Sequence, residues 1–254
     1  MINERYKLFH QSSLPVTAMA MDYPHGYMTH RHHHPHAQLI HAVRGVMLIG
    51  TDQGQWIVPP SRGVWMPPHV EHWVRMIGEV HMRTAYIRPD AAPDLFTACK
   101  VVGISPLLRE LLLSAIDVSL PYEPDSRAGH LMRLLLDEIK DVQSLTLQLP
   151  NPHDARLKVI TTALTLNPDD ATTVEIWAER LHITPKTIHR LFSKETGMTF
   201  GQWRQQIRLL AALERLAQGE KVLTVALGLG YSSQSAFAAM FKRQFGMPPS
   251  QFFD

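Results

Sequence analysis

The chain has 254 residues, of which 45% are hydrophobic and 19% are charged. This composition excludes disorder along the whole chain, because the apolar side chains suffice for the cores of one large or two medium domains. The formal net charge is only +2, so a surface that binds nucleic acid would have to be local. The single cysteine, Cys99, excludes an internal disulfide framework and a multi-cysteine zinc site, and we expect it to be inert.

The apolar runs of the chain are short. Residues 111–116 are typical of them, whereas a helix that spans a bilayer needs about 20 predominantly apolar residues. The N-terminal ten residues also lack the apolar core of a signal peptide. We therefore expect a soluble cytoplasmic protein that makes no contact with a membrane.

The first 93 residues have the character of a β domain. They contain nine of the 18 prolines and four short β-branched or aromatic runs, at residues 37–41, 46–51, 55–58 and 83–87. Short strands separated by glycine-containing turns are typical of a sandwich or barrel. The remainder of the chain has helical periodicity, so the sequence predicts an α+β fold with an N-terminal β-barrel domain.

Residues 94–149 are predicted to form a helical linker or dimerisation segment. Leucines recur at helical spacing in residues 106–116 and again in residues 129–142. This apolar stripe would either pack on the β domain or form the seam of a homodimer, and the sequence does not separate these alternatives. The prolines around residues 149–152 indicate a linker, so we place a third domain at residues 150–254.

The third domain contains an internal repeat. Four residues with helical spacing, Val174, Trp177, Ala178 and Leu181, recur 48 residues later as Val222, Val225, Ala226 and Leu229. After a turn that is one residue longer in the second copy, the offset becomes 49. Each copy has the pattern of a helix-turn-helix, at about residues 173–195 and 221–245.

Local signals support the helices of both copies. Thr172 and Glu175 have the spacing of a capping box, Thr184 precedes a proline at the first helical position, and Ser233 has the equivalent place in the second copy. Residues 199–218 are predicted to form a connecting helix about 27 Å long. Such a rod would hold two recognition helices at a separation close to the roughly 34 Å between major-groove segments on one face of DNA.

Two interpretations fit this repeat: a helical bundle whose charges are merely solvated, or a DNA-binding domain. The stretches AERLHITPKTIHRLFSKETGMTFGQWRQQIRLLAALERL and ALGLGYSSQSAFAAMFKRQFGMPPSQF resemble the AraC/XylS family of bacterial transcription regulators. The glycine-tyrosine pair before the second recognition helix and the F-x-x-x-F-G-x-x-P ending are characteristic of that family. The resemblance covers nearly all of residues 154–254 and favours DNA binding.

The resemblance also implies roles for individual residues. Lys186, His189 and Arg190 would lie at base edges, and threonines together with the arginines of the connecting helix would lie at phosphates. In the second recognition helix, alanines replace most base-reading side chains, so we expect the first helix to carry most of the specificity. The candidate DNA-binding residues are Thr184, Lys186, Thr187, His189, Arg190, Lys194, Arg204, Arg208, Ser232, Ser233, Gln234, Ser235 and Ala239.

Histidines are concentrated near the N-terminus, where 11 of the 15 lie within the first 81 residues. The densest run, residues 30–36, contains His32 and His34, and Gln38 follows at the same parity. Because alternate side chains of a strand share a face, we expect these three side chains to point the same way. A further histidine, His72, follows a glycine and two adjacent prolines downstream.

The pattern His-x-His-x3-Gln-x6-Gly, followed by Gly-x3-Pro-Pro-x3-His, resembles the two motifs of the cupin barrel. Three imidazoles and an amide oxygen suit zinc, iron, nickel or manganese, so His32, His34, Gln38 and His72 are candidate ligands of a divalent metal ion. Cupin metal sites have a glutamate where this chain has neutral Gln38, which removes one compensating charge. We favour an effector pocket lined by His32, His34, Gln38, Trp65 and His72, with a metal site or an adventitious histidine tract as the alternatives.

The sequence thus predicts a transcription regulator of the AraC/XylS type, without catalytic residues, that controls promoters in response to a small-molecule effector. Its expected partners are double-stranded promoter DNA, the effector and a second copy of the chain, with RNA polymerase as a further candidate. Activation and repression are both open. The rival hypotheses are a metal-dependent cupin enzyme, such as a dioxygenase or isomerase with a helical appendage, and a constitutive DNA-binding protein whose barrel only dimerises.

Overall fold

The computed structural model describes residues 8–145 and 149–252. The chain divides into two compact units: the first lies within residues 1–148 apart from residues 53–55, and the second contains residues 53–55 and 149–254. Within the described residues, no helix is both long and apolar enough to cross a membrane.

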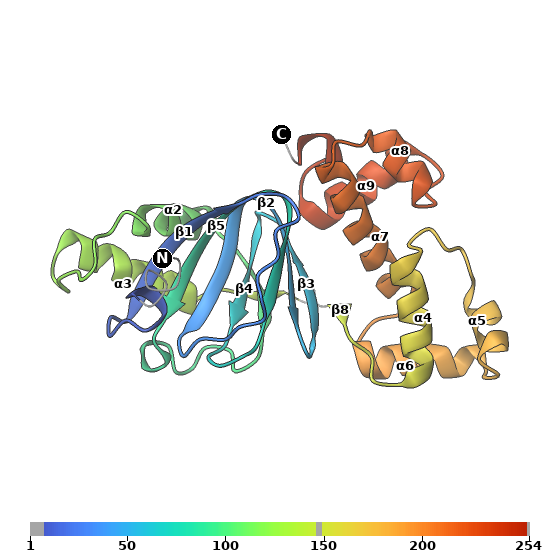
Figure 1. Ribbon diagram of the computed structural model, residues 1–254, viewed down its shortest axis with the longest axis horizontal. Coiled ribbons are helices and arrows are strands. Elements are labelled where there is room, and N and C mark those ends of the chain that lie inside the picture. Colours follow the sequence, from blue (N-terminus) through green and yellow to red (C-terminus); the bar gives the residue numbers. More distant parts are fainter. Residues whose placement is uncertain (1–7, 146–148, 253–254) are drawn as a thin grey trace. The chain divides into compact units, whose positions relative to one another are not determined.

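The first unit is built on an antiparallel sheet (Figure 1). Its path runs β1-β5-β2-β4-β6-β7, and β3 pairs with β2 and, at the start of the second unit, with β8. The strands are β1 (Val16–Tyr23), β2 (Ala37–Thr51), β3 (Gly54–Val58), β4 (Arg62–Met66), β5 (Trp73–Ile87), β6 (Lys100–Gly103), β7 (Ser144–Leu145) and β8 (Leu149–Pro150).

The two 15-residue strands β2 and β5 form the centre of the sheet. They pair antiparallel from Ala37 opposite Ile87 to Gly50 opposite Trp73, with the register interrupted between Ala42 and Val46. Gly45 lies in this irregularity at a φ of 76°, and a Cβ there would lie 2.3 Å from the carbonyl oxygen of Glu79. Only glycine fits such an approach, so this position allows β2 to bend and to take part in both halves of the sheet.

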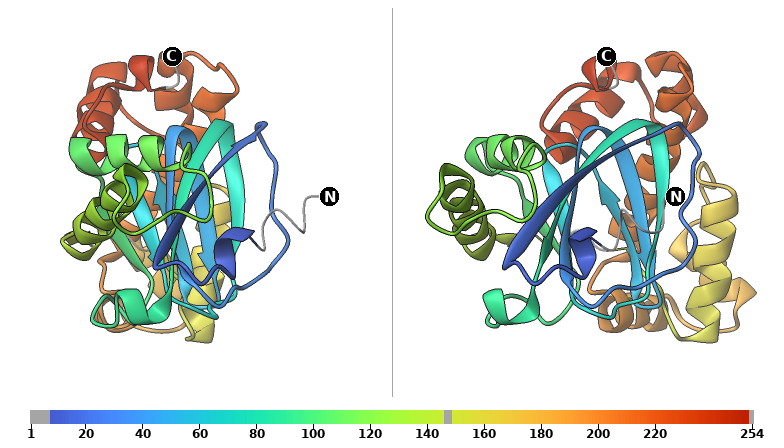
Figure 2. Two further views of the ribbon diagram at one scale, coloured as in Figure 1. Left: turned by 90° about the vertical axis from the view of Figure 1, so that its left-hand side faces the viewer. Right: turned by 60° about the vertical axis from the view of Figure 1, so that its left-hand side comes forward.

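The two faces of the sheet pack in different hydrophobic clusters. Leu39, Ala85 and Ile87 lie in a cluster with helices α2 (Pro106–Ala115) and α3 (Arg127–Lys140), whereas Ile40 and Met82 lie in a cluster within the sheet domain. Figure 2 shows the two green helices covering one side of the sheet. The strand alternation expected from the sequence therefore separates a helix-covered face from an inner face.

Helices α2 and α3 bury their apolar stripe against the sheet. Leu108, Leu112, Leu135 and Ile139 are at most 1% exposed and belong to the helix-covered cluster. Ser105 and Ser126 cap the two helices by accepting hydrogen bonds from backbone N–H groups. Of the two alternatives that the sequence left open for this stripe, packing on the β domain is the one seen within the chain.

The second unit consists of helices. They are α4 (Ala155–Leu166), α5 (Val174–Arg180), α6 (Pro185–Thr196), α7 (Phe200–Ala217), α8 (Val222–Gly228) and α9 (Gln234–Phe245). A short 3-10 helix, η2 (Pro249–Gln251), follows α9. A second 3-10 helix, η1 (Pro89–Ala91), belongs to the first unit. In Figure 1, α7 runs between the α4–α6 group and the α8–α9 group.

The caps of these helices follow the sequence with one exception. Thr184 and Ser233 cap α6 and α9, and Thr199 begins α7 with a capping box. The capping box predicted at Thr172 is wrong, because Thr173 is the N-cap of α5 and accepts the hydrogen bond from Ile176 N. The N–H of Thr172 instead donates to the carboxylate of Asp170, 2.6 Å away.

The repeat extends to the conformation of the turns. His182 has a φ of 52° and Gly230, 48 residues later, has a φ of 76°. In both turns the next residue donates to a carbonyl five residues back, Ile183 N to Ala178 O and Tyr231 N to Ala226 O. The two copies therefore share one helix-turn-helix geometry, and the first copy holds a non-glycine residue in the left-handed region.

A pH-dependent stability follows from the fully buried His41 on β2. Burial lowers the pKa of His41 to about 4, so the unfolded chain, where histidine titrates near 6.5, binds a proton that the folded chain does not. This contribution to stability is present above pH 6.5 and is lost as the pH falls toward 4, by about 3 kcal/mol in total. Urea unfolding at several pH values should therefore give a shallower pH slope for His41→Gln than for the wild type. The control His130→Gln, at an exposed position on α3, should keep the wild-type slope, and equal slopes for all three proteins would contradict the assignment.

Candidate functional site

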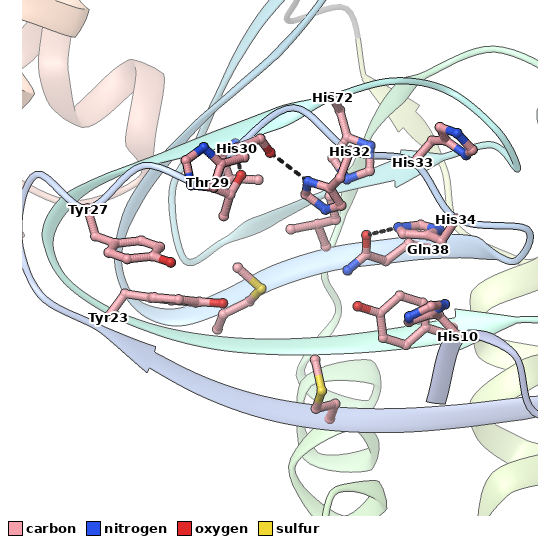
Figure 3. A pocket seen from close by; sticks show the side chains of 15 residues that line it. His10, Tyr23, Tyr27, Thr29, His30, His32, His33, His34, Gln38 and His72 are labelled. Atoms are coloured by element: carbon pink, nitrogen blue, oxygen red, sulfur yellow. Dashed lines mark hydrogen bonds between the residues drawn. The ribbon is translucent and has the colours of Figure 1, made fainter. Parts of the chain in front are cut away.

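The first unit contains a cavity of about 370 Å³ on the inner face of the sheet (Figure 3). Fifteen side chains line it, and none of them is Asp, Glu, Lys or Arg: His10, Met19, Tyr23, Tyr27, Thr29, His30, His32, His33, His34, Gln38, Ile40, His72, Val74, Met82 and Tyr86. Its size is in the range of pockets that bind small molecules.

Strand alternation explains which side chains reach this cavity. On β2, Gln38 and Ile40 face it, while Leu39 between them packs under the helices. On β5, Met82 and Tyr86 have the same orientation. The shared face of His32, His34 and Gln38 that the sequence predicts is thus present in the lining of one pocket.

His32 and His72 lie opposite each other in an isolated antiparallel bridge. Their backbones exchange two hydrogen bonds, of 3.0 and 2.9 Å, and their ring centroids are 4.4 Å apart. The ring of His34 lies 5.2 Å from that of His72. Within the described residues, these three side chains form a group in which one nitrogen from each lies within 4.8 Å of the others, so they are the candidate ligands for a shared metal ion.

The buried members of this group are uncharged at neutral pH. Burial lowers the pKa of His34 to about 4 and that of His72 to about 3, against weaker raising effects of their hydrogen bonds. Without a lining carboxylate, lysine or arginine, the cavity offers imidazoles, phenols and an amide over an apolar floor.

The side chain of Gln38 is fixed by a chain of hydrogen bonds. Its Nε2 donates to Thr84 Oγ1 at 2.8 Å, and the Thr84 hydroxyl donates to Leu39 O at 2.9 Å. This leaves the Gln38 amide oxygen 2.8 Å from Nε2 of His34. Gln38 is thereby positioned beside the histidines, at the place where the sequence comparison with cupins expects a ligand.

Trp65 does not line this cavity, which corrects the predicted pocket. It is 2% exposed and packs in the helix-covered cluster, and its indole Nε1 donates to Phe96 O at 2.8 Å. Trp65 of β4 pairs with Leu39 of β2, whereas Gln38 pairs with the next residue of β4. Trp65 therefore points to the face opposite the cavity, as Leu39 does.

Several lining residues were absent from the sequence prediction. The rings of Tyr23 and Tyr27 stack at 4.9 Å, and Tyr86 meets the edge of His34 at 5.2 Å. Parity along β1 and β5 would have indicated Tyr23 and Tyr86 once the pairing of these strands was known. No sequence signal indicated His10 or Tyr27, which reach the cavity from outside the strands.

In the second unit, α6 has one exposed polar face. Lys186, His189, Arg190 and Lys194 are exposed, whereas the opposite face of the helix is buried in the core of the domain. Thr184 accepts the N–H of Thr187 at the start of the helix, and the two hydroxyls are 3.0 Å apart. The structure therefore places the predicted base-reading residues together on an accessible surface.

The second recognition helix, α9, exposes a less polar face. The predicted residues Ser232, Ser233, Gln234, Ser235 and Ala239 are all exposed. Sequence reasoning missed two exposed cations in the last turn, which are Lys242 and Arg243. The 49-residue offset would have found Arg243, because it pairs that residue with Lys194.

Two of the three arginines of α7, Arg204 and Arg208, make hydrogen bonds within the domain that the sequence did not predict. The guanidinium of Arg208 donates to backbone carbonyls in the loop before α5, at 2.9 Å to Pro168 and at 3.4 to 3.5 Å to the next two residues. A Cβ at Gly230, in the turn of the second copy, would lie 3.3 Å from the same guanidinium. Arg204 donates to Thr172 O at 3.4 Å and lies over the ring of Phe200. Arg208 therefore links the entry loop of the first helix-turn-helix with the turn of the second.

These features define a class of protein: a two-unit chain with a pocket for a small ligand and a tandem helix-turn-helix domain. Sequence profiles match in the same order, the AraC-like ligand binding domain at residues 16–149 and a helix-turn-helix domain at residues 177–254. The chain is 32% identical to the HTH-type transcriptional regulator NimR of Escherichia coli K12, over 87% of this chain and 81% of that protein. It is 26% identical to the HTH-type transcriptional regulator YobQ of Bacillus subtilis, over 87% of each chain.

The chain belongs to the AraC family of transcription regulators and combines a ligand-binding domain with a helix-turn-helix DNA-binding domain. Among solved structures, ToxT from Vibrio cholerae with a bound unsaturated fatty acid resembles it with a TM-score of 0.39 and 11% identity, over 94% of each chain. Both relatives given above, NimR and YobQ, bear the name of HTH-type transcriptional regulators.

The contacts of Arg208 lead to a prediction that separates a structural arginine from a phosphate ligand. Replacing a side chain that contacts a phosphate reduces the slope of log K against log salt by about 1. We expect this reduction for Lys194→Ala, whereas Arg208→Ala should keep the wild-type slope and lose about 1–3 kcal/mol of stability through its hydrogen bonds. Fluorescence anisotropy over a salt series, combined with thermal unfolding, measures both quantities. A reduced slope with unchanged stability for Arg208→Ala would show that this arginine contacts phosphate after all.

Proposed function

We propose that this regulator binds its operator through α6 and α9 and changes promoter activity when a small effector occupies the cavity of its first unit. The observation that carries the proposal is the exposed face of α6, where Lys186, His189 and Arg190 lie together beyond a buried opposite face. The N-terminal part of a recognition helix is the part that meets base edges in the major groove.

Within this proposal, the two recognition helices have different tasks. Lys186 and Arg190 can donate to O6 and N7 of guanine, and His189 can make a further contact in the same groove. On α9, Gln234 and Ser235 are the candidate base readers, while Arg243 and Lys194 at the ends of the two helices are suited to phosphates. Specificity then resides mainly in α6, and α9 anchors the second major-groove contact.

The effector proposal is supported by the chemistry of the cavity. Its polar groups are imidazoles, phenols, a hydroxyl and an amide, and its floor contains Met19, Ile40 and Met82. Such a lining suits a ligand that accepts electron pairs or forms hydrogen bonds, and it contains no lysine or arginine to neutralise a phosphate or a carboxylate. The enzyme hypothesis has less support, because the site lacks the carboxylate that the cupin motif supplies at the position of Gln38.

Assembly and location belong to the same proposal. Leu107 and Leu134 on the helices that cover the sheet are 49% and 45% exposed, which suits a contact between two copies of the chain. A homodimer would present two tandem helix-turn-helix domains to one promoter, where RNA polymerase is a further partner. We place the protein in the cytoplasm, where the promoters are.

Specific readout by Arg190 can be tested directly. Arg190→Ala should weaken binding to the operator by about 1–3 kcal/mol, which is roughly 5- to 160-fold, and relax base preference at one position of the site. Genome-wide mapping of bound promoters supplies the operator, and competition binding with single-base variants measures the preference. Ser193→Ala, at an exposed position on the same helix, is the matched control. Equal losses on operator and random DNA for Arg190→Ala would instead assign this arginine to a phosphate.

A further inference from the structure

The orientation of three imidazoles in the cavity depends on backbone carbonyls. Nδ1 of His32 lies 2.8 Å from His30 O, Nδ1 of His34 lies 2.7 Å from His36 O, and Nδ1 of His72 lies 2.9 Å from Val70 O. A carbonyl oxygen only accepts, so each Nδ1 must carry the proton that it donates. In a neutral imidazole, Nε2 then has an unprotonated lone pair.

This arrangement creates a conflict at His34. Its Nε2 faces the amide oxygen of Gln38 at 2.8 Å, so two acceptors meet with no hydrogen between them. Turning the Gln38 amide over would satisfy His34 but would bring the amide oxygen to Thr84, whose hydroxyl would then have to give up its hydrogen bond to Leu39 O. Protonating both nitrogens of His34 would place a cation among lining residues that include no carboxylate.

A metal ion resolves this conflict because it accepts both lone pairs at once. Backbone carbonyls that hold Nδ1–H and thereby direct Nε2 are the usual outer-sphere arrangement of histidine ligands. One nitrogen from each of the three rings already lies within 4.8 Å of the others. Ligands about 2.1 Å from one ion in a tetrahedral arrangement are about 3.4 Å apart, so the ring nitrogens would need to approach by up to about 1.4 Å.

We propose that His32, His34 and His72, together with the amide oxygen of Gln38, bind a divalent transition-metal ion reversibly. This inference rests on the proposed function and deepens it, since it names such an ion as the ligand that the pocket senses. Three imidazoles select zinc, nickel, cobalt or copper over calcium and magnesium, which prefer oxygen ligands. The four ligands are neutral, which keeps affinity below that of a site with a carboxylate and allows the ion to leave.

The test uses the full-length, untagged, chelator-treated protein and titrates it with Co²⁺, Ni²⁺, Zn²⁺ and, for comparison, Mg²⁺. We expect one Co²⁺ per chain with a ligand-field absorption spectrum, and no binding of Mg²⁺. His72→Ala and His34→Ala should each weaken Co²⁺ binding more than tenfold. His69→Ala is the matched control, because His69 is an exposed histidine near the site that does not line the cavity, and its removal should leave the affinity unchanged.

A variant that binds Co²⁺ more tightly than the wild type is also needed, because a misfolded variant can lose affinity but does not gain it. Gln38→Glu restores a compensating charge at the fourth ligand and should tighten Co²⁺ binding at least tenfold, with a changed absorption spectrum. The metal inference is overturned if His69→Ala weakens binding as much as His72→Ala, which would indicate adventitious binding by surface histidines. It is equally overturned if no stoichiometric Co²⁺ binding occurs or if Gln38→Glu leaves the affinity unchanged.

Operator binding separates this inference from the proposed function. Measured with and without Ni²⁺ or Zn²⁺, operator affinity or promoter output should change at least fivefold in the wild type and should not change in His72→Ala. Metal bound at the histidines without any such change overturns the sensing role of the ion. The other decisive outcome is an organic molecule that binds in the cavity of the metal-free protein and alters promoter output. This result would support the proposed function and would show that the metal ion is not the ligand that the pocket senses.

Discussion

The alternation of side chains along β2 and β5 is the constraint on which the first unit depends. Because Leu39 packs under α2 and α3, its neighbours Gln38 and Ile40 must face the other way, into the cavity. A shift of the register by one residue would bury Gln38 beneath the helices and expose the core leucine to the pocket. Hydrophobic packing on one face of the sheet thus fixes the position of the polar groups on the other face.

The second unit divides its basic residues between two tasks. The cations of α6 extend from an exposed face, so they are available to a ligand outside the chain. Arg208 of α7 instead satisfies backbone carbonyls within the domain, and Arg215 forms a salt bridge of 2.7 Å with Glu220. These two arginines of the connecting helix therefore have partners within the domain. A small net charge is compatible with DNA binding under these conditions, since only the recognition helices have to present cations.

Much of the architecture could be predicted from the sequence because it rests on local periodicity. The 48-residue repeat, the caps at Thr184 and Ser233 and the extent of α7 depend on neighbouring residues, and period analysis detects them. Sequence reasoning did not reach features that depend on strand pairing or on a long-range contact. The face of Trp65 depends on the register of β4 with β2, and the hydrogen bonds of Arg208 reach a loop 40 residues away in the sequence. Without the strand register, Trp65 was placed in the pocket, and the family resemblance that placed Arg208 at a phosphate contained no information on this loop.

A ligand in the cavity can influence the rest of the chain only if it binds two arrangements with different affinity. The histidines are attached to the sheet unequally, which indicates where such a difference can arise. Gln38 lies within the continuous ladder of β2, whereas His32 and His34 lie on a segment outside the strands, which is joined to β5 and to the residues before it by isolated bridges and a few further backbone hydrogen bonds. A short bridge has fewer hydrogen bonds to lose than a continuous ladder, so this segment has the lower cost of displacement. Drawing the imidazoles together around a ligand would therefore move the segment against β5 and leave the sheet intact. Arg31 on the same segment forms ion pairs with Asp52 and Glu71, at 2.9 and 3.1 Å, but these pairs are exposed and oppose such a movement only weakly.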